Sequence, residues 1–261
     1  MTAPDTVTRL RAAGCVWAED EAALLESAAG TPEALERMVA RRVAGEPLET
    51  VLGWVEFLGR RLVVAPGVFV PRRRTELLAR TAVAHAARLR APVVVEMCCG
   101  VAPVAACVDG AGELHAADLS RTALDCARAN APTATLHEGD LYDALPEALR
   151  GRVDVLVANA PYVPTGRIRD MPPEARDHEP LVALDGGPDG VDLHRRLAAG
   201  SPEWLAPGGV LLVETSPSQA PATTAAMAAA GLTTEVAAEP EVGGCVAIGA
   251  RVGVSPAGEP A

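Results

Sequence analysis

The chain has 261 residues and a formal net charge of −11 at pH 7; 49% of its residues are hydrophobic and only 3% are aromatic. This composition predicts one large domain, or one domain plus a small appendage, with a core of alanine, valine and leucine. The acidic charge disfavours broad binding of nucleic acid, which needs a basic surface. No stretch approaches the ~20 apolar residues of a membrane span, and the first residues lack the charged start and apolar centre of a signal peptide.

The six cysteines are scattered along the chain, and none belongs to a C-x-x-C pair. This spacing indicates neither a disulfide framework nor a zinc site. We therefore expect reduced thiols in a cytoplasmic protein, with no metal ligands.

The first sixty residues are predicted to be helical. The clearest helix is TPEALERMVARRVAG, in which Thr31 is the expected N-cap, Pro32 takes the first helical position and Gly45 ends the helix. The amphipathic segment EDEAALLESAAG precedes it. Two or three short helices bury little surface alone, so they should pack on the remainder of the chain. Residues 1 to about 8 and the tail 253–261 are expected to be disordered.

From about residue 71 onward, predicted strands alternate with helices. The helices are expected near Pro103 and over residues 120–130, 191–205 and 218–231. The strands are expected over residues 93–97, 113–118, 133–140, 153–159 and 208–215, with two short strands near Thr233 and Val246. This alternation predicts an α/β fold with a doubly wound, mostly parallel sheet.

Ligands of such sheets bind beyond the carboxyl ends of the strands. The candidate site residues are therefore those that follow predicted strands, namely 96–102, Asp118, Asp140 and 159–162. An acid such as Asp118, at the end of the second strand, can accept hydrogen bonds from two ribose hydroxyls. The alternative is a solvated loop acid. The succession of Glu96, Gly100, Asp118 and Asp140 favours a nucleoside-containing cofactor.

The turn after the first strand, EMCCGVAP, differs from a dinucleotide fingerprint. That fingerprint needs three glycines, and only Gly100 is present, with the small residues Cys98 and Ala102 on either side. Close approach of the backbone to a ligand is impaired rather than forbidden. We expect a ligand with a methionine-like end instead of a pyrophosphate.

The stretch VDVLVANAPYVP ends a buried strand in an amide, a proline and an aromatic ring. One interpretation is a strand followed by a turn. The other is a platform for a planar amide or amino group. The Asn159 oxygen and the Ala160 carbonyl would accept from one NH₂ group, Pro161 would aim that carbonyl, and the ring of Tyr162 would stack on the planar group. Two acceptors on one nitrogen fix its orientation toward an electrophile.

NAPY resembles the (N/D/S)PP(Y/F) signature of S-adenosylmethionine-dependent amino-methyltransferases. The following run, YVPTGRIRDMPPEARDHEPLVALDGGPDGVDLHRR, is similar to the protein-(glutamine-N5) methyltransferase family of the HemK/PrmC type. PGVFVPRRRTELL resembles the PGVFIPRPETELL of that family, and GEPLETVLGWVEFLG resembles its preceding segment. The resemblance covers roughly residues 30 to 250, and the run around DHEP is its most specific part.

The resemblance implies a class I methyltransferase fold with a mixed seven-stranded sheet over residues 61–252, behind a small helical substrate-recognition domain over residues 1–60. It implies methyl transfer from S-adenosyl-L-methionine to a protein glutamine, in the best-known members the GGQ glutamine of a class I peptide-chain release factor. By motif position, Asp118 is the ribose ligand, and Asp140 and Leu141 border the adenine. The loop under the methionine part comprises Cys98, Cys99, Gly100, Val101 and Ala102. The glutamine is held by Asn159, Ala160, Pro161 and Tyr162, and Asn159 is also expected among the cofactor-binding residues, as is Glu96.

The chain departs from the family pattern at three places. Cys98 and Ala102 replace glycines of the first motif, Ala160 replaces the first proline of NPPY, and Arg73-Arg74 replaces Pro-Glu. The run Arg72 to Arg74 is either a solvated approach to a helix or a contact with an acidic partner or a ribosomal RNA-like surface. Two other functions stay open: a degenerate methyltransferase fold that only binds, and a nucleic-acid amino-methyltransferase.

Overall fold

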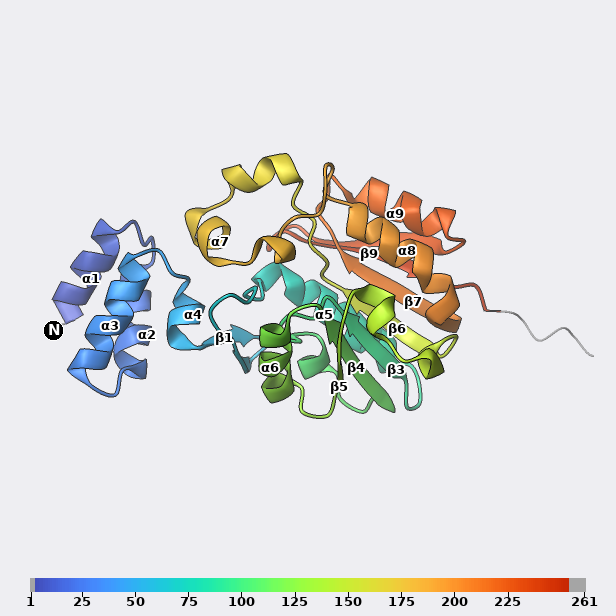
Figure 1. Ribbon diagram of the computed structural model, residues 1–261, viewed down its shortest axis with the longest axis horizontal. Helices are drawn as coiled ribbons and strands as arrows, with labels where there is room; N and C mark the ends of the chain where they lie inside the picture. The colour runs from blue at the N-terminus through green and yellow to red at the C-terminus, as the bar shows by residue number, and fades with distance from the viewer. Residues whose placement is uncertain (1–2, 254–261) are drawn as a thin grey trace, which may run out of the picture.

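The computed structural model of the chain describes residues 3–253, and the helices at its start lie together at one end of the molecule (Figure 1). They are α1 (Ala3–Ala12), α2 (Ala18–Ala28), α3 (Pro32–Val43) and α4 (Leu48–Leu52). The Thr31 side chain accepts a hydrogen bond from the N–H of Ala34, so Thr31 is the N-cap that the sequence predicts. Leu10, Leu25 and Val39 are fully buried in a small core that these helices share.

Two expectations at the chain ends have different outcomes. Disorder over residues 1 to about 8 is wrong for the described part, because α1 already begins at Ala3 and buries Leu10. The tail 253–261 lies outside the described residues apart from Gly253.

A β-hairpin comes after the helices, in place of the helical structure expected up to residue 60. Its strands are β1 (Trp54–Phe57) and β2 (Arg60–Val63), paired antiparallel with Phe57 opposite Arg60. Leu58 and Gly59 both have positive φ, of 48° and 73°, as a tight hairpin turn requires. Val55 and Phe57 are buried with an exposed residue between them, which is the period of two of a strand.

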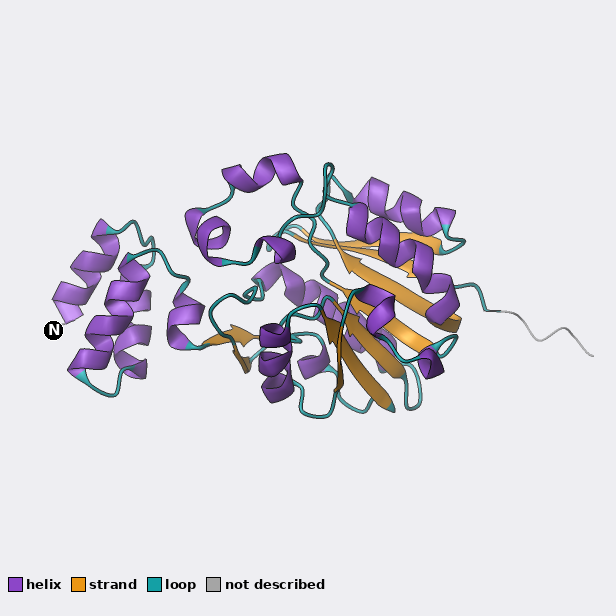
Figure 2. Cartoon of the chain, viewed as in Figure 1, coloured by secondary structure: helices purple, strands orange, loops and turns teal. Residues whose placement is uncertain are grey.

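A seven-stranded sheet forms the centre of the chain from β3 onward (Figure 2). Its strand order is β5-β4-β3-β6-β7-β9-β8. All neighbours are parallel except for the pairs that include β9. The doubly wound α/β fold predicted from the sequence is therefore confirmed. The strands are β3 (Val93–Met97), β4 (Glu113–Asp118), β5 (Thr135–Glu138), β6 (Val153–Ala158), β7 (Leu205–Glu214), β8 (Thr233–Glu239) and β9 (Gly244–Ala250).

Helices cover both faces of the sheet, so its strands are buried on both sides. The helices α5 (Glu76–Ala86) and α6 (Arg121–Asn130) contribute to the core on one face, together with the hairpin. The helices α8 (Asp192–Trp204) and α9 (Ala220–Ala229) contribute to the core on the other. All five residues of β3 are buried, which explains its continuous apolar sequence.

The helix expected near Pro103 is reduced to one 3₁₀ turn, Ala105–Cys107. The Glu96 carboxylate accepts from the backbone N–H groups of Val104 and Ala105 and so caps this turn, and the chain becomes extended at Val108. Residues 165–184 form a segment above the sheet that contains a short helix, α7 (Pro173–His178), and two 3₁₀ turns, Thr165–Asp170 and Leu181–Ala183.

Candidate active site

The sheet register brings the predicted site residues together. Met97 at the end of β3 lies opposite Ala117 in β4 and opposite Ala158 in β6. Cys98, Asp118 and Asn159 therefore leave neighbouring strands at the same edge. The chain order reverses between β3 and β6, which is the switch point where open α/β sheets bind ligands.

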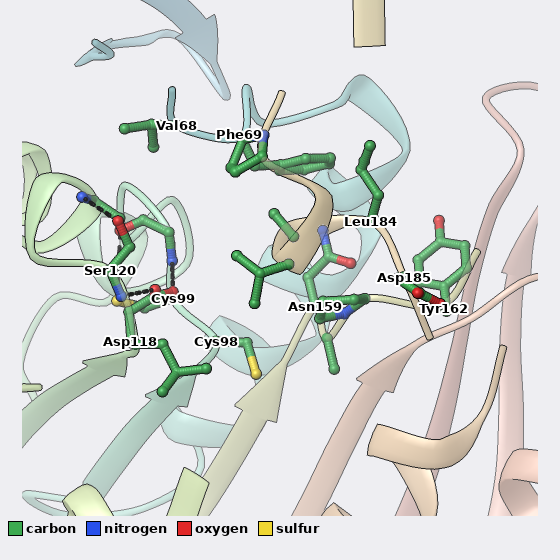
Figure 3. A pocket seen from close by; sticks show the side chains of 18 of the residues that line it. Val68, Phe69, Cys98, Cys99, Asp118, Ser120, Asn159, Tyr162, Leu184 and Asp185 are labelled. Carbon is green, nitrogen blue, oxygen red and sulfur yellow. Dashed lines mark hydrogen bonds between the residues drawn. The ribbon is translucent and has the colours of Figure 1, made fainter. Parts of the chain in front are cut away.

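A cavity of about 1120 Å³ lies at this edge (Figure 3). Its floor is formed by the turns after β3, β4 and β6, and its walls include Pro47 and Glu49 of the N-terminal part and residues of the 165–184 segment. Seven acidic side chains and three arginines of the described chain line it. This acidic lining suits a ligand with positive charge.

Asp118 is held rigidly at one end of the cavity. Its two carboxylate oxygens accept hydrogen bonds at 2.8 Å from the backbone N–H groups of Gly100 and Ser120 (Figure 3). Burial raises the pKa of Asp118, while these hydrogen bonds act in the opposite direction. Each oxygen keeps acceptor capacity, so the fixed carboxylate can bind two neighbouring hydroxyl groups.

The turn after β3 adopts the backbone that glycines favour, although only one glycine is present. Cys98, Gly100 and Ala102 have φ of 49°, 53° and 59°. The left-handed region costs a non-glycine residue roughly 1 kcal/mol or more. Glu96 supports this strained turn from below, and burial raises its pKa to about 8 against the effect of the two N–H groups that it binds.

The other predicted cofactor residues lie around this turn. Cys99, Val101 and Leu141 line the cavity, as do Cys98 and Gly100. Asp140 also lines it and accepts a hydrogen bond from Arg196 at 2.8 Å. Ala102 does not line the cavity, because its left-handed φ turns the methyl group into the core, where it is fully buried.

Asn159 points into the other half of the cavity, near Phe69 and Leu184 (Figure 3). Its Nδ2 atom donates to the hydroxyl of Thr75 at 3.4 Å. Burial raises the pKa of the nearby Glu214, and Thr75 acts against that rise. The amide of Asn159 thus uses its nitrogen on Thr75. Thr75 therefore fixes the amide so that Oδ1 is the atom left for a ligand.

The residues after Asn159 also line the cavity, and a glycine-rich block packs behind them. No residue of the range 3–253 donates a hydrogen bond to the Ala160 carbonyl, so this oxygen keeps its acceptor capacity, in a residue that is only 1% exposed. A Cβ at Gly186 would lie 2.8 Å from the Pro161 oxygen, and one at Gly190 would lie even closer to the Tyr162 oxygen. Only glycine permits this close approach, which explains two of the three glycines of the DGGPDG stretch.

Tyr162 is held by two charged residues that the sequence did not assign to the site. Its hydroxyl accepts from Nε of Arg74 at 2.8 Å and donates to Glu214 at 3.1 Å. Arg74 also lies 3.3 Å from the same oxygen of Glu214, a carboxylate whose side chain is only 1% exposed. Burial raises the pKa of both Tyr162 and Glu214. The guanidinium of Arg74 thus lies next to the Tyr162 ring, and the Tyr162 hydroxyl already has two hydrogen-bond partners, Arg74 and Glu214.

A second buried glutamate holds the 165–184 segment. Glu179, in the DHEP run, accepts from the backbone N–H of Val70 at 3.1 Å and from Arg72 at 2.7 and 2.6 Å. Arg42 of α3 pairs with Glu174 of the same segment at 2.7 Å. Of the two interpretations of the arginine run, the solvated one is wrong for Arg72 and Arg74, because each pairs with a buried carboxylate.

Comparisons with known proteins identify the family. A 4-amino-L-phenylalanine/4-methylamino-L-phenylalanine methyltransferase of Streptomyces pristinaespiralis is 40% identical over 186 residues, which cover 67% of this chain but only 63% of that protein. A release factor glutamine methyltransferase of Mycolicibacterium smegmatis is 36% identical over 223 residues, 82% of this chain and 78% of that protein. The chain belongs to the release factor glutamine methyltransferase family. No family model matches it.

A solved structure supports the fold assignment. A methyltransferase from Pyrococcus furiosus matches with a TM-score of 0.55 at 14% identity, over 83% of this chain and 99% of that one. The expected class I methyltransferase fold is therefore confirmed. S-adenosyl-L-methionine is the cofactor of this fold and family, and the site fits it: Asp118 offers two oxygens for the ribose, and the acidic lining suits the sulfonium cation.

Proposed function

We propose that this chain transfers a methyl group from S-adenosyl-L-methionine to the N5 side-chain amide of a protein glutamine, and that its substrate is a class I peptide-chain release factor in the cytoplasm. The observation that carries this proposal is the pair of acceptors at the corner, by which we mean residues 159–162 after β6. Asn159 and Ala160 line the same cavity as Asp118, and Figure 3 shows Asn159 and Asp118 in different parts of it. Among residues 3–253, no helix is both long and apolar enough to cross a bilayer.

The corner accounts for the reaction on a weak nucleophile. The cofactor supplies an electrophilic methyl group on a sulfonium. An amide nitrogen is a poor nucleophile because its lone pair is delocalised, so its orientation matters. Asn159 and Ala160 would accept both N–H bonds of the substrate NH₂ group and stabilise the positive charge that develops on it. Within residues 3–253, no acidic or basic side chain is hydrogen-bonded to Asn159 or to the Ala160 carbonyl, so the proton would leave to water after transfer.

Replacing Asn159 tests the assignment. Asn159→Ala should lower turnover on a release factor by about 10²–10³-fold, the usual effect of removing one preorganised partner of a developing charge. Its affinity for S-adenosyl-L-methionine should stay within about threefold of the wild type, since Asn159 lies at the other end from Asp118. Asn159→Asp keeps an acceptor at the same place and should retain part of the activity. Unchanged turnover in the alanine variant would contradict the proposal.

A second candidate substrate is an aromatic amine of a free amino acid. The Streptomyces pristinaespiralis relative is named for such a substrate, and two acceptors at one corner would orient an arylamine NH₂ as well as an amide. Assaying 4-amino-L-phenylalanine beside a release factor separates the two. A nucleic-acid substrate is disfavoured by the net charge of −11. If the chain does not bind S-adenosyl-L-methionine, the third alternative is favoured: a degenerate methyltransferase fold that binds a partner without catalysing a reaction.

A further inference from the structure

Arg74 presents an unused hydrogen-bonding edge to the substrate half of the cavity. Its Nε atom donates to the hydroxyl of Tyr162 and faces Glu214. Its two terminal nitrogens form no hydrogen bond with any residue between 3 and 253. The side chain is 40% exposed and lines the cavity, whereas Glu214 is buried behind it.

The position of this edge is fixed from three sides. Glu214 ends β7, Tyr162 follows β6, and Arg74 precedes Thr75, whose hydroxyl orients Asn159. The Cζ atom of Arg74 lies 5.8 Å from the centre of the Tyr162 ring. A guanidinium held this way by its inner edge loses little conformational freedom when its outer edge binds a ligand.

The chemistry of the free edge selects its ligand. Two parallel N–H donors on one planar group match the two oxygens of a carboxylate, and this paired geometry is stronger and more specific than a single hydrogen bond. The other two arginines of the cavity wall, Arg72 and Arg196, each use a terminal nitrogen on a carboxylate of the protein. Arg74 is thus the arginine of this wall with both terminal nitrogens available.

We propose that Arg74 binds a carboxylate of the substrate close to the nitrogen that is methylated. This inference rests on the proposed function and adds a substrate class to it: a glutamine or amine whose neighbouring group is anionic. The carboxylate can belong to the α-position of a free or C-terminal residue, or to an acidic side chain next to the target. Both present the same planar group to the guanidinium.

Equilibrium binding of small probes tests this without relying on turnover. The enzyme is first saturated with S-adenosylhomocysteine. The probes are N-acetyl-L-glutamine and its carboxamide for the α-carboxylate, and the blocked dipeptides Ac-Gln-Glu-NH₂ and Ac-Gln-Gln-NH₂ for an acidic side chain. The anionic member of at least one pair should bind about 10- to 100-fold more tightly, the usual range for one charge-assisted pair. The pair that shows the preference identifies the source of the carboxylate.

Two variants of Arg74 and one of its neighbour complete the design. Arg74→Gln should abolish the preference, so that the ratio of the two affinities within each pair falls to about one; this ratio, not the absolute affinity of either probe, is the readout. Arg74→Lys keeps the charge and the ion pair with Glu214 but lacks the fork, and should retain only part of the preference. Arg73→Gln removes the same charge from an exposed residue that does not line the cavity, and should change nothing.

Equal binding of both members in each pair, binding of no probe, or a preference that survives in Arg74→Gln would each overturn the inference. Methyl transfer is scored separately. A wild-type enzyme that prefers the anionic probes but methylates no release factor and no amine would contradict the proposed function and leave the carboxylate site standing.

Discussion

Replacing Asp118 by asparagine is expected to weaken cofactor binding by about 30- to 5000-fold. In the structure this carboxylate is already positioned by Gly100 and Ser120, so it needs no rearrangement to meet the ribose. Two hydrogen bonds from hydroxyls to a carboxylate contribute about 1.5–3 kcal/mol each, and a neutral amide keeps one acceptor worth about 1 kcal/mol. The expected loss of about 2–5 kcal/mol corresponds to that range of affinity.

The assay is calorimetric titration with S-adenosylhomocysteine, which is not consumed. Asp125→Asn makes the same change on the exposed side of α6, where Asp125 only pairs with Arg121 and Arg128, and should bind as the wild type does. Urea unfolding of Asp118→Asn checks that the protein is folded. A folded variant that binds within threefold of the wild type would refute the ribose assignment. Asp118 would then have a structural role only, as the acceptor for the N–H groups of Gly100 and Ser120.

Two further predictions concern stability. Cys98→Gly should raise the free energy of unfolding by about 0.5–1 kcal/mol, measured as a shift in the urea midpoint. Glycine adopts the φ of 49° without strain, and little packing is lost with the half-buried thiol. A lower midpoint would contradict the strain argument. Burial lowers the pKa of His194 to about 4, so its contribution to stability is present above its unfolded pKa of about 6.5 and is lost as the pH falls toward 4. Urea unfolding at pH 7.5 and pH 4.5 should show that wild type loses up to about 3 kcal/mol more than His194→Gln, and equal losses would show that His194 does not titrate in this way.

The sequence predicts the half of the site that comes from strand ends. The alternation of strands and helices sets the order of the strands, and the residue after each parallel strand falls at one edge of the sheet. Asp118 and Asn159 follow from that rule without any knowledge of side-chain contacts. The hairpin over residues 54–63 escapes such reasoning because each strand has four residues, too few for a period of two to stand out from a helical pattern.

The residues that hold the corner in place could not be derived in the same way. Arg74 meets Tyr162 and Glu214 across 88 and 140 positions of the chain, and only the folded sheet brings these segments together. The available signals were indirect: an arginine run just before a helix, and a glutamate at the end of an apolar strand. A buried charge needs a partner, so Glu214 in LLVET was a signal for a nearby cation, but not for which one.

The structure also separates the effects of the departures from the family pattern. Cys98 lines the same part of the cavity as Asp118. The strain of its positive φ lowers stability, but Asp118 still accepts from both of its backbone partners, Gly100 and Ser120. Arg74 and Ala160 line the acceptor half, on either side of the oriented amide of Asn159. A guanidinium held against Tyr162 changes the charge that a substrate meets there, but reaches no cofactor contact. Sequence change at residue 74 is therefore expected to alter which substrate is methylated and to leave cofactor affinity as it is, which is why cofactor binding alone cannot identify the substrate of this chain.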